Sequence, residues 1–179
     1  MKPHLILVSG PPGVGKSTLS QKLAAKLHAT LLDKDAIDES FSPGDRGDRY
    51  TRVVEPKVLS ALLELAALNL RPGHSVILDV PWTHILLNTP VWVTRIHELV
   101  RRKKAKLSII ECTLDETQHR ARLKKRGLKR DQFRLSSKGW KKFRKTDRLG
   151  ELNPLQHFEI DMASSPATVL RKALEFLRC

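Results

Sequence analysis

The sequence has 179 residues, of which 40% are hydrophobic and 29% charged, and it carries a formal net charge of +14. This length is typical of one domain, and no apolar run approaches the roughly 18 residues of a membrane span. We therefore expect a single domain over residues 1–179, with no membrane segment. Two cysteines, Cys112 and Cys179, cannot form a disulfide framework, and the N-terminus does not resemble a secretory leader, so the sequence predicts a cytoplasmic protein.

The excess of positive charge is confined to one segment. Residues 95–150 contain 20 lysines and arginines against 6 acidic residues, whereas residues 1–94 contain 10 against 9 and residues 151–179 contain 3 against 4. Such a segment attracts anions, for example nucleotide phosphates or a nucleic-acid backbone. A solvated face without a partner is the alternative interpretation.

Short apolar runs alternate along the chain with longer stretches of helical periodicity. We expect strands at residues 4–9, 29–32, 75–80, 107–113 and 158–162. We expect helices over residues 16–28 and 56–70, after Thr89-Pro90, after Thr113 and after Ser165-Pro166. Strands that alternate with helices predict an α/β fold, in which helices cover both faces of a parallel sheet. Residues 128–150 fit no regular pattern.

A phosphate-binding motif follows the first expected strand. The consecutive residues Gly10, Pro11, Pro12, Gly13, Val14, Gly15, Lys16, Ser17 and Thr18 match the Walker A pattern G-x-x-x-x-G-K-[ST]. Glycines let the loop curl so that its backbone N–H groups face phosphates, and the helix that follows adds its positive dipole end. Lys16 would reach the β- and γ-phosphates, and the Ser17 hydroxyl would bind Mg²⁺. The motif therefore predicts a nucleoside triphosphate site.

Aspartates stand at the ends of two further expected strands. Asp33 and Asp35 follow the second strand and Asp79 ends the third, and ligands of open α/β sheets bind at such strand ends. Asp35 suits a general base that accepts a proton from a hydroxyl, and Asp79 suits a position near Mg²⁺. Asp33 could serve either role. The sequence lacks an Asn-Lys-x-Asp guanine signature, which favours a small phosphotransferase over a GTPase.

The basic segment contains arginines with a spacing that suits phosphoryl transfer. Arg122 and Arg126 lie four residues apart on one helical face, and Arg130 follows after Gly127. We expect residues 120–150 to form a basic lid, in which Arg122 binds the nucleotide while Arg126 and Arg130 stabilise the transferring group. Aromatic residues stand among the lysines of this segment, which leaves nucleic acid open as an acceptor: Phe133, Trp140 and Phe143.

Taken together, these motifs resemble the small P-loop kinases of the nucleotide-kinase-like group, such as gluconate kinase, adenylylsulfate kinase, chloramphenicol phosphotransferase, zeta toxins and polynucleotide 5′-kinase. The matching pieces are the Walker A loop, residues 32–35, residues 76–79, the lid arginines and Ile160-Asp161. The resemblance implies a three-layer α/β/α P-loop fold with a five-stranded parallel sheet in the order 2-3-1-4-5. It also implies ATP with Mg²⁺ as cofactors and transfer to a hydroxyl group.

One position departs from this group. Polynucleotide and adenylylsulfate kinases typically carry an arginine three residues after the second aspartate, where this chain has Asp38. The departure favours a neutral or amine-bearing acceptor over an anionic one.

The leading hypothesis is an ATP-dependent kinase of a small hydroxyl compound, such as a sugar, a nucleoside or an amino sugar. Its catalytic residues would be Lys16, Asp35, Arg126 and Arg130, and Ser17 and Asp79 would lie at the metal. A polynucleotide 5′-hydroxyl kinase is the first alternative, and a nucleotide-binding switch that acts through a partner protein is the second. The sequence does not indicate an oligomeric state.

Overall fold

A computed structural model describes residues 2–41, 47, 49–128 and 131–178. Its five strands form one parallel sheet in the order β2-β3-β1-β4-β5, which confirms the expected α/β fold and strand order. The strands are β1 (His4–Ser9), β2 (Thr30–Asp33), β3 (Ser75–Asp79), β4 (Lys106–Thr113) and β5 (Phe158–Asp161).

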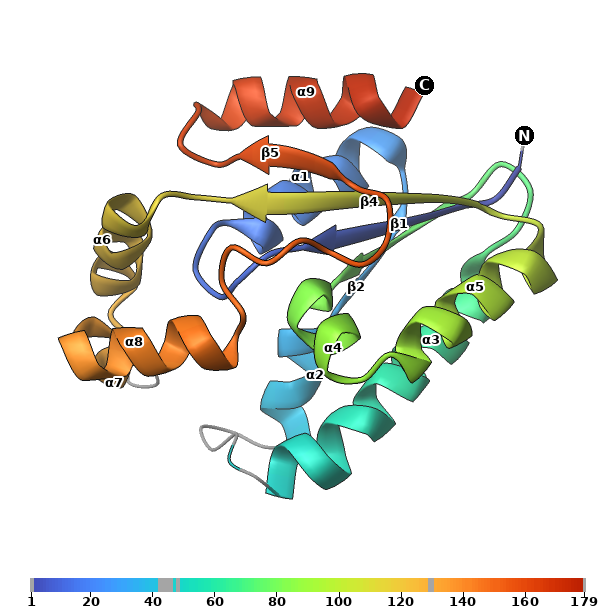
Figure 1. The fold of residues 1–179 in the computed structure, drawn as a ribbon. Coiled ribbons are helices and arrows are strands. Elements are labelled where there is room, and N and C mark those ends of the chain that lie inside the picture. The colour runs from blue at the N-terminus through green and yellow to red at the C-terminus, as the bar shows by residue number, and fades with distance from the viewer. Residues whose placement is uncertain (1, 42–46, 48, 129–130, 179) are drawn as a thin grey trace.

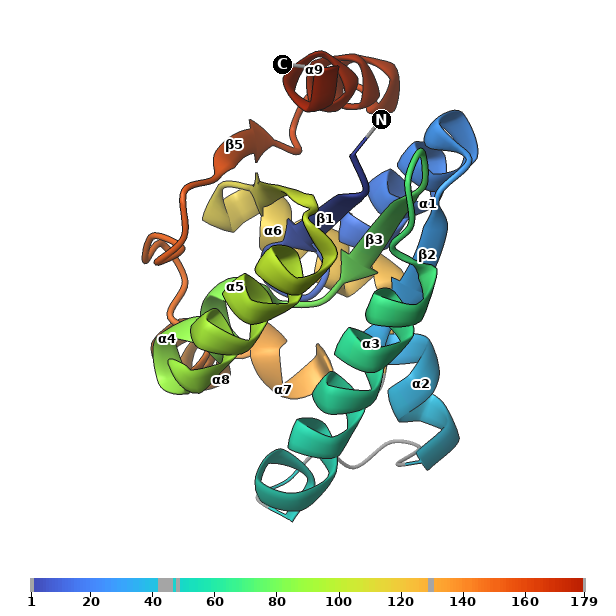
Figure 2. The ribbon, with the colours of Figure 1, turned by 90° about the vertical axis from the view of Figure 1, so that its right-hand side faces the viewer.

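Helices cover both faces of the sheet (Figure 1). Alternation along β1 sends Leu5 and Leu7 to one face and Ile6 and Val8 to the other, and all four side chains are fully buried. The first face packs against α3 (Glu55–Asn69), α4 (Trp82–Asn88) and α5 (Val91–Lys103). The opposite face packs against α1 (Lys16–Leu27) and α9 (Pro166–Arg178), and Figure 2 shows α3 and α5 side by side beneath the sheet. The continuous apolar strands of the sequence are therefore explained by burial on both faces.

Two further helical segments lie between β2 and α3. The helix α2 (Lys34–Phe41) begins directly after β2, and a π-helical turn, η1 (Tyr50–Val54), leads into α3. The turn-rich composition of residues 42–49 predicts a loop, and residues 42–46 and 48 of this stretch lie outside the described residues. No described helix has both the length and the apolar character needed to cross a membrane.

The expected lid is more regular than the sequence indicates. It comprises α6 (Glu116–Arg126), α7 (Gln132–Leu135) and α8 (Ser137–Thr146), which Figure 1 shows together beyond the end of β4. The prediction that residues 128–150 are irregular is wrong because Trp140 and Phe143 of α8 pack against Leu123 of α6 in a small core of their own. The Ser136 hydroxyl also caps α8 by accepting a hydrogen bond from the Gly139 N–H at 3.0 Å.

Candidate active site

The Walker A residues form a tight loop between β1 and α1. Gly10 has a φ of +127°, and a Cβ atom there would lie 2.4 Å from the carbonyl oxygen of Cys112 on β4. Gly13 has a φ of +87°, and a Cβ atom there would lie 2.4 Å from a methyl carbon of Leu123 on α6. Only glycine fits these positions, because the backbone conformation and the close approach both exclude a side chain.

The charged and hydroxyl groups of the loop stand at the N-terminus of α1. Lys16 is the first residue of α1, and its ammonium group donates a hydrogen bond to the carbonyl oxygen of Pro11 at 3.1 Å. The Ser17 hydroxyl hydrogen-bonds to the Asp79 carboxylate at the end of β3. The unpaired N–H groups at the N-terminus of α1 therefore lie close to the Lys16 ammonium group, the Ser17 hydroxyl and the Asp79 carboxylate.

Asp79 is buried and has one carboxylate oxygen without a partner. Desolvation raises the pKa of Asp79 to about 6, although the Lys16 charge and the Ser17 hydrogen bond oppose the rise. Within the part of the chain that the structure describes, its buried Oδ2 has no hydrogen-bond partner. A carboxylate oxygen and a serine hydroxyl are ligands that suit Mg²⁺, so these residues fit the expected ion. Among the described residues, no group of three or more His, Cys, Asp or Glu side chains is placed to hold a metal ion.

A cavity of about 520 Å³ opens beside the loop, and we call it the loop cavity. It brings together residues that the sequence predicts for the site from the Walker A loop, from the end of β2 and from the lid. Four predicted site residues do not line it: Gly10, Pro11, Val14 and Asp79. Val14 is fully buried in the core, and the Asp79 carboxylate is buried and hydrogen-bonds to Ser17. The residues that line it are Pro12, Gly13, Gly15, Lys16, Ser17, Thr18, Asp35, Arg122, Lys125 and Arg126.

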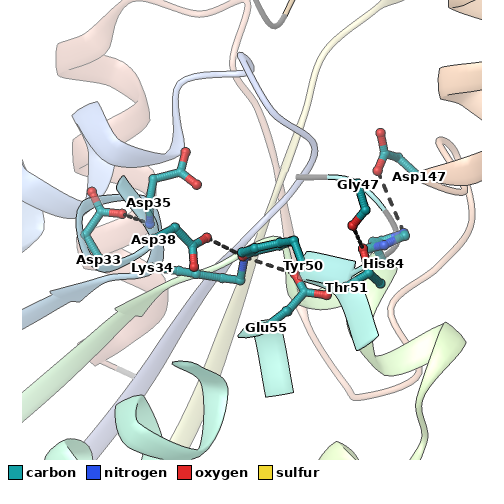
Figure 3. Close-up of polar contacts among 10 residues, drawn as sticks. All are labelled: Asp33, Lys34, Asp35, Asp38, Gly47, Tyr50, Thr51, Glu55, His84 and Asp147. Atoms are coloured by element: carbon teal, nitrogen blue, oxygen red, sulfur yellow. Dashed lines mark hydrogen bonds and ion pairs between the residues drawn. The ribbon is translucent and has the colours of Figure 1, made fainter. Parts of the chain in front are cut away.

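Asp35 belongs to the first turn of α2, where the two neighbouring residues hold the backbone. Asp33 accepts a hydrogen bond from the Asp35 N–H at 2.8 Å, so Asp33 closes the turn between β2 and α2. Lys34 turns inward, and Figure 3 shows the Asp35 carboxylate directed away from the Lys34 ammonium group. This alternation leaves the Asp35 carboxylate on the wall of the loop cavity.

Lys34 lies at the centre of a buried polar cluster that also contains Asp38, Tyr50 and Glu55 (Figure 3). Its ammonium group contacts Asp38 at 2.8 Å, the Tyr50 hydroxyl at 2.6 Å and Glu55 at 2.9 Å. Asp38 is fully buried, so it is neither an exposed charge nor an acidic wall of an open pocket. The sequence argument that Asp38 favours an amine-bearing acceptor therefore loses its basis, because Lys34 compensates the Asp38 charge.

The lid arginines contact the protein in this structure. Arg122 donates hydrogen bonds at 2.6 Å to the carbonyl oxygens of Val14 and Met162. Arg126 donates to the buried Asp131 at 2.8 Å from its Nε atom. Both arginines line the loop cavity, and their proposed roles in nucleotide binding and transfer stay predictions. Arg130 lies outside the described residues.

Two residues of α6 that sequence reasoning missed also contribute to this region. Lys125 lines the loop cavity beside Arg126. The His119 ring is buried, and its Nε2 donates a hydrogen bond to the carbonyl oxygen of Pro12 at 2.7 Å. Burial, followed by nearby positive charges, lowers the pKa of His119, although the Pro12 hydrogen bond opposes this. His119 precedes Arg122 and Leu123 by three and four residues, a spacing that would have placed all three on one helical face.

A second cavity, of about 310 Å³, lies on the other side of Pro12, and we call it the acidic cavity. Its carboxylates come from β4, α6, β5 and the segment that leads from α8 to β5. Glu111 has a signal in the sequence, since it is a charged residue inside an otherwise apolar strand, but that signal was missed. The ionisable residues that line the cavity are His84, Glu111, Glu116, His119, Arg144, Asp147, Arg148, Glu151, His157 and Glu159.

A third cavity, of about 210 Å³, adjoins the loop cavity at Gly15, Thr18 and Arg122. Its other walls are mainly apolar and come from α1, the end of β5 and the start of α9, through Leu19, Lys22, Met162, Ser164, Pro166 and Val169. It therefore extends the loop cavity past the N-terminus of α1.

Two of the three aromatic residues that stand among the lysines of the lid are buried. Trp140 and Phe143 are buried in the lid core, where they pack against each other and against the His119 ring. Phe133 alone among the three is exposed, with the Lys142 ammonium group 5.9 Å from its ring centre. Trp140 and Phe143 are therefore not available to stack on bases, whereas the Phe133 ring is accessible.

Comparisons with known proteins agree with this geometry. A model of the AAA domain family matches residues 5–148. A shikimate kinase from Corynebacterium efficiens is 33% identical over 101 residues, which are 55% of this chain and 57% of that protein. The chain therefore spans little more than half the length of that curated relative.

Solved structures extend the likeness over the whole chain. A candidate kinase from Chloroflexus aurantiacus has a TM-score of 0.73 and 26% identity, with 99% of this chain and 98% of that chain covered. A gluconokinase from Sinorhizobium meliloti has a TM-score of 0.64 and 19% identity, with 98% and 92% covered, and shows a shared fold.

Proposed function

The chain belongs to the AAA domain family, and from this premise we propose that it is an ATP-dependent phosphotransferase that acts on a hydroxyl group of a small molecule. The observation that carries the proposal is that Lys16, Ser17 and Asp35 all line the loop cavity. The kinase names of the similar proteins support it.

The nucleotide would lie along the loop and α1. Backbone N–H groups of the Walker A loop and the N-terminus of α1 would bind the phosphates, and Lys16 would exchange its bond to the Pro11 carbonyl for the β- and γ-phosphates. The third cavity would receive the nucleoside, because it continues from the phosphate end at Gly15 and Thr18. Arg122 lines both cavities and would fix the nucleotide between them.

Ser17 and Asp79 would hold the Mg²⁺ ion that accompanies ATP. The ion would neutralise charge on the β- and γ-phosphates during transfer. The buried and unpartnered Asp79 Oδ2 supports this assignment, because a lone carboxylate oxygen in a desolvated position gains most from a cation.

The acceptor hydroxyl would stand between Asp35 and the γ-phosphorus. Asp35 would take the hydroxyl proton as the acceptor oxygen forms its bond to phosphorus and the bond to the β-phosphate oxygen breaks, which releases ADP. Lys16, Lys125 and Arg126 would compensate the negative charge on the transferring group, since all three line the loop cavity.

Asp35→Asn tests the base assignment. Measured with Mg²⁺, radiolabelled ATP and a panel of sugars, nucleosides and amino sugars, this variant should transfer phosphate about 10²–10⁴-fold more slowly than wild type. Its ATP dissociation constant should stay within a factor of about three, since the proposed role of Asp35 concerns the acceptor and not the phosphates. Glu64→Gln, at an exposed carboxylate of α3, is the matched control and should transfer at the wild-type rate. Normal transfer by Asp35→Asn would contradict the assignment.

A further inference from the structure

The acidic cavity contains two carboxylates that lack a strong basic partner. Three of its five carboxylates have a basic group close by: Glu116 contacts Arg144 at 3.2 Å, Glu151 contacts Arg148 at 2.9 Å, and Glu159 lies 3.5 Å from the His157 ring. Its two arginines are thereby engaged at the rim. Glu111 and Asp147 remain, and no described lysine or arginine forms an ion pair with either.

Glu111 is 7% exposed and is held by neutral groups alone. Its Oε2 accepts hydrogen bonds from the Thr83 hydroxyl at 2.5 Å and from the Asn153 amide at 3.3 Å, and Ser9 contacts Thr83 from behind at 3.1 Å. These donors fix the carboxylate in place, but they do not neutralise its charge. Neither a hydrogen bond nor an ion pair engages Oε1 among the described residues, and Glu111 lines the cavity.

Asp147 provides the second carboxylate, from the segment after α8. Its nearest basic group is the His84 ring, whose Nδ1 lies 3.8 Å from the Asp147 carboxylate, beyond hydrogen-bond distance (Figure 3). Burial raises the pKa of Asp147, although the charges of His84, Arg134 and Lys16 oppose the rise, so burial outweighs these cations.

A third group in the cavity wall points independently to a ligand. Trp140 is 3% exposed and lines the cavity, yet its indole N–H has no acceptor in the described part of the chain. Buried indole N–H groups normally find a partner, so this donor fits a ligand with a hydroxyl or ether oxygen.

We propose that the acidic cavity binds the ammonium group of a hydroxylated amine, and that this amine is the phosphoryl acceptor. The second clause rests on the proposed function. An ammonium group supplies the cation that Glu111 and Asp147 lack, and it has three N–H donors for carboxylate oxygens. Pro12 lines both the acidic cavity and the loop cavity, so an ammonium group held here lies against the same loop that would hold the γ-phosphate.

Calorimetric titration without nucleotide tests the site. The full chain is titrated with matched pairs that differ in one amine: glucosamine against glucose, and ethanolamine against ethylene glycol. We expect an amine to bind at least about tenfold more tightly than its matched alcohol, and Glu111→Gln to remove that preference. Glu64→Gln, which changes an exposed carboxylate of α3 outside the acidic cavity, should keep it. Equal affinity within both pairs, or an unchanged preference in Glu111→Gln, would overturn the proposal.

Thermal unfolding separates a binding role of Glu111 from a structural one. In Glu111→Gln, the amide oxygen of the new side chain would still accept the Thr83 hydrogen bond, while the buried charge would be gone. This variant should therefore have a Tm equal to or above that of wild type. A lower Tm would mean that the carboxylate stabilises the fold and would overturn the argument from uncompensated charge. Asp147→Asn provides a second variant, for which we expect the same loss of amine preference.

Phosphorylation assays keep this proposal distinct from the proposed function. Amine binding without nucleotide requires no transfer activity, so a chain that binds amines but phosphorylates nothing would overturn the kinase proposal and the acceptor assignment while the amine site stands. A chain that phosphorylates neutral alcohols and shows no amine preference would leave the kinase proposal intact and overturn the site.

Discussion

The two cavities on either side of Pro12 are built in opposite ways. The loop cavity takes most of its lining from one stretch of the chain, and its lysines and arginines make it basic. The acidic cavity gathers its carboxylates from β4, α6, β5 and the segment before β5, and none of them belongs to a contiguous motif. The comparison teaches that one loop can border a basic cavity and also an acidic one.

The two cavities also differ in how their charges are compensated. In the loop cavity, Lys16 and Arg122 donate to loop carbonyls and Arg126 pairs with Asp131, so each of these cations has a partner before any ligand binds. In the acidic cavity, Glu111 accepts hydrogen bonds from neutral donors, and the basic partner of Asp147 is the His84 ring at 3.8 Å. We therefore expect ligand binding to require rearranged side chains in the loop cavity, and to require mainly a counter-charge in the acidic cavity.

The largest effect should come from replacing Lys16, which tests the role of the basic loop cavity in phosphoryl transfer. Lys16→Ala should reduce phosphoryl transfer by about 10²–10³-fold, because the lysine charge at the β- and γ-phosphates is lost. Amine affinity should not fall, since Lys16 does not line the acidic cavity and its removal takes a positive charge away from Asp147. Steady-state kinetics and calorimetry check the two expectations, and Lys26→Ala, an exposed lysine on the same helix, is the control. Loss of amine binding in Lys16→Ala would mean that the cavities are not separate.

A second change tests the buried polar cluster around Lys34, next to Asp35 in α2. Lys34→Met leaves Asp38 and Glu55 without their buried cation, so the free energy of unfolding should fall by about 3–5 kcal/mol in urea titrations. Lys57→Met, an exposed lysine of α3, should change it by less than about 0.5 kcal/mol. Similar stabilities for the two variants would show that the cluster does not hold α2, and with it Asp35, against α3.

The smallest effect concerns how the free energy of unfolding depends on pH, and it tests the burial of Asp147 in the acidic cavity. Burial raises the pKa of Asp147, so between its ordinary and raised values the folded chain keeps a proton that the unfolded chain releases. This contribution stabilises the fold at low pH and is lost as pH rises. Asp147→Asn should lack it, so urea unfolding of wild type and variant across the acidic to neutral range should show wild type losing stability relative to the variant. A difference that does not vary with pH would argue against a desolvated Asp147.

The sequence predicted those parts of the molecule that local patterns determine. The strand order implied by the resemblance is confirmed, and the Walker A loop and Asp35 meet at one cavity, because glycine spacing and apolar runs are local signals. The partners of Asp38 and Glu111 were not predictable in the same way. Lys34 lies close to Asp38 in sequence, but its burial depends on Tyr50 and Glu55, and Glu111 meets Asn153 from 42 residues away. Such contacts depend on how the helices pack, which single-residue patterns do not encode.

Phosphorus NMR of the chain with ATP, Mg²⁺ and the amine and alcohol pairs tests the central claim most directly. We predict that the ATP signals decrease while ADP and a phosphate ester of one acceptor appear in equal amounts, and that Asp35→Asn gives neither product at a comparable rate. The appearance of ADP with inorganic phosphate alone, for every acceptor, would show hydrolysis without transfer and would contradict the account.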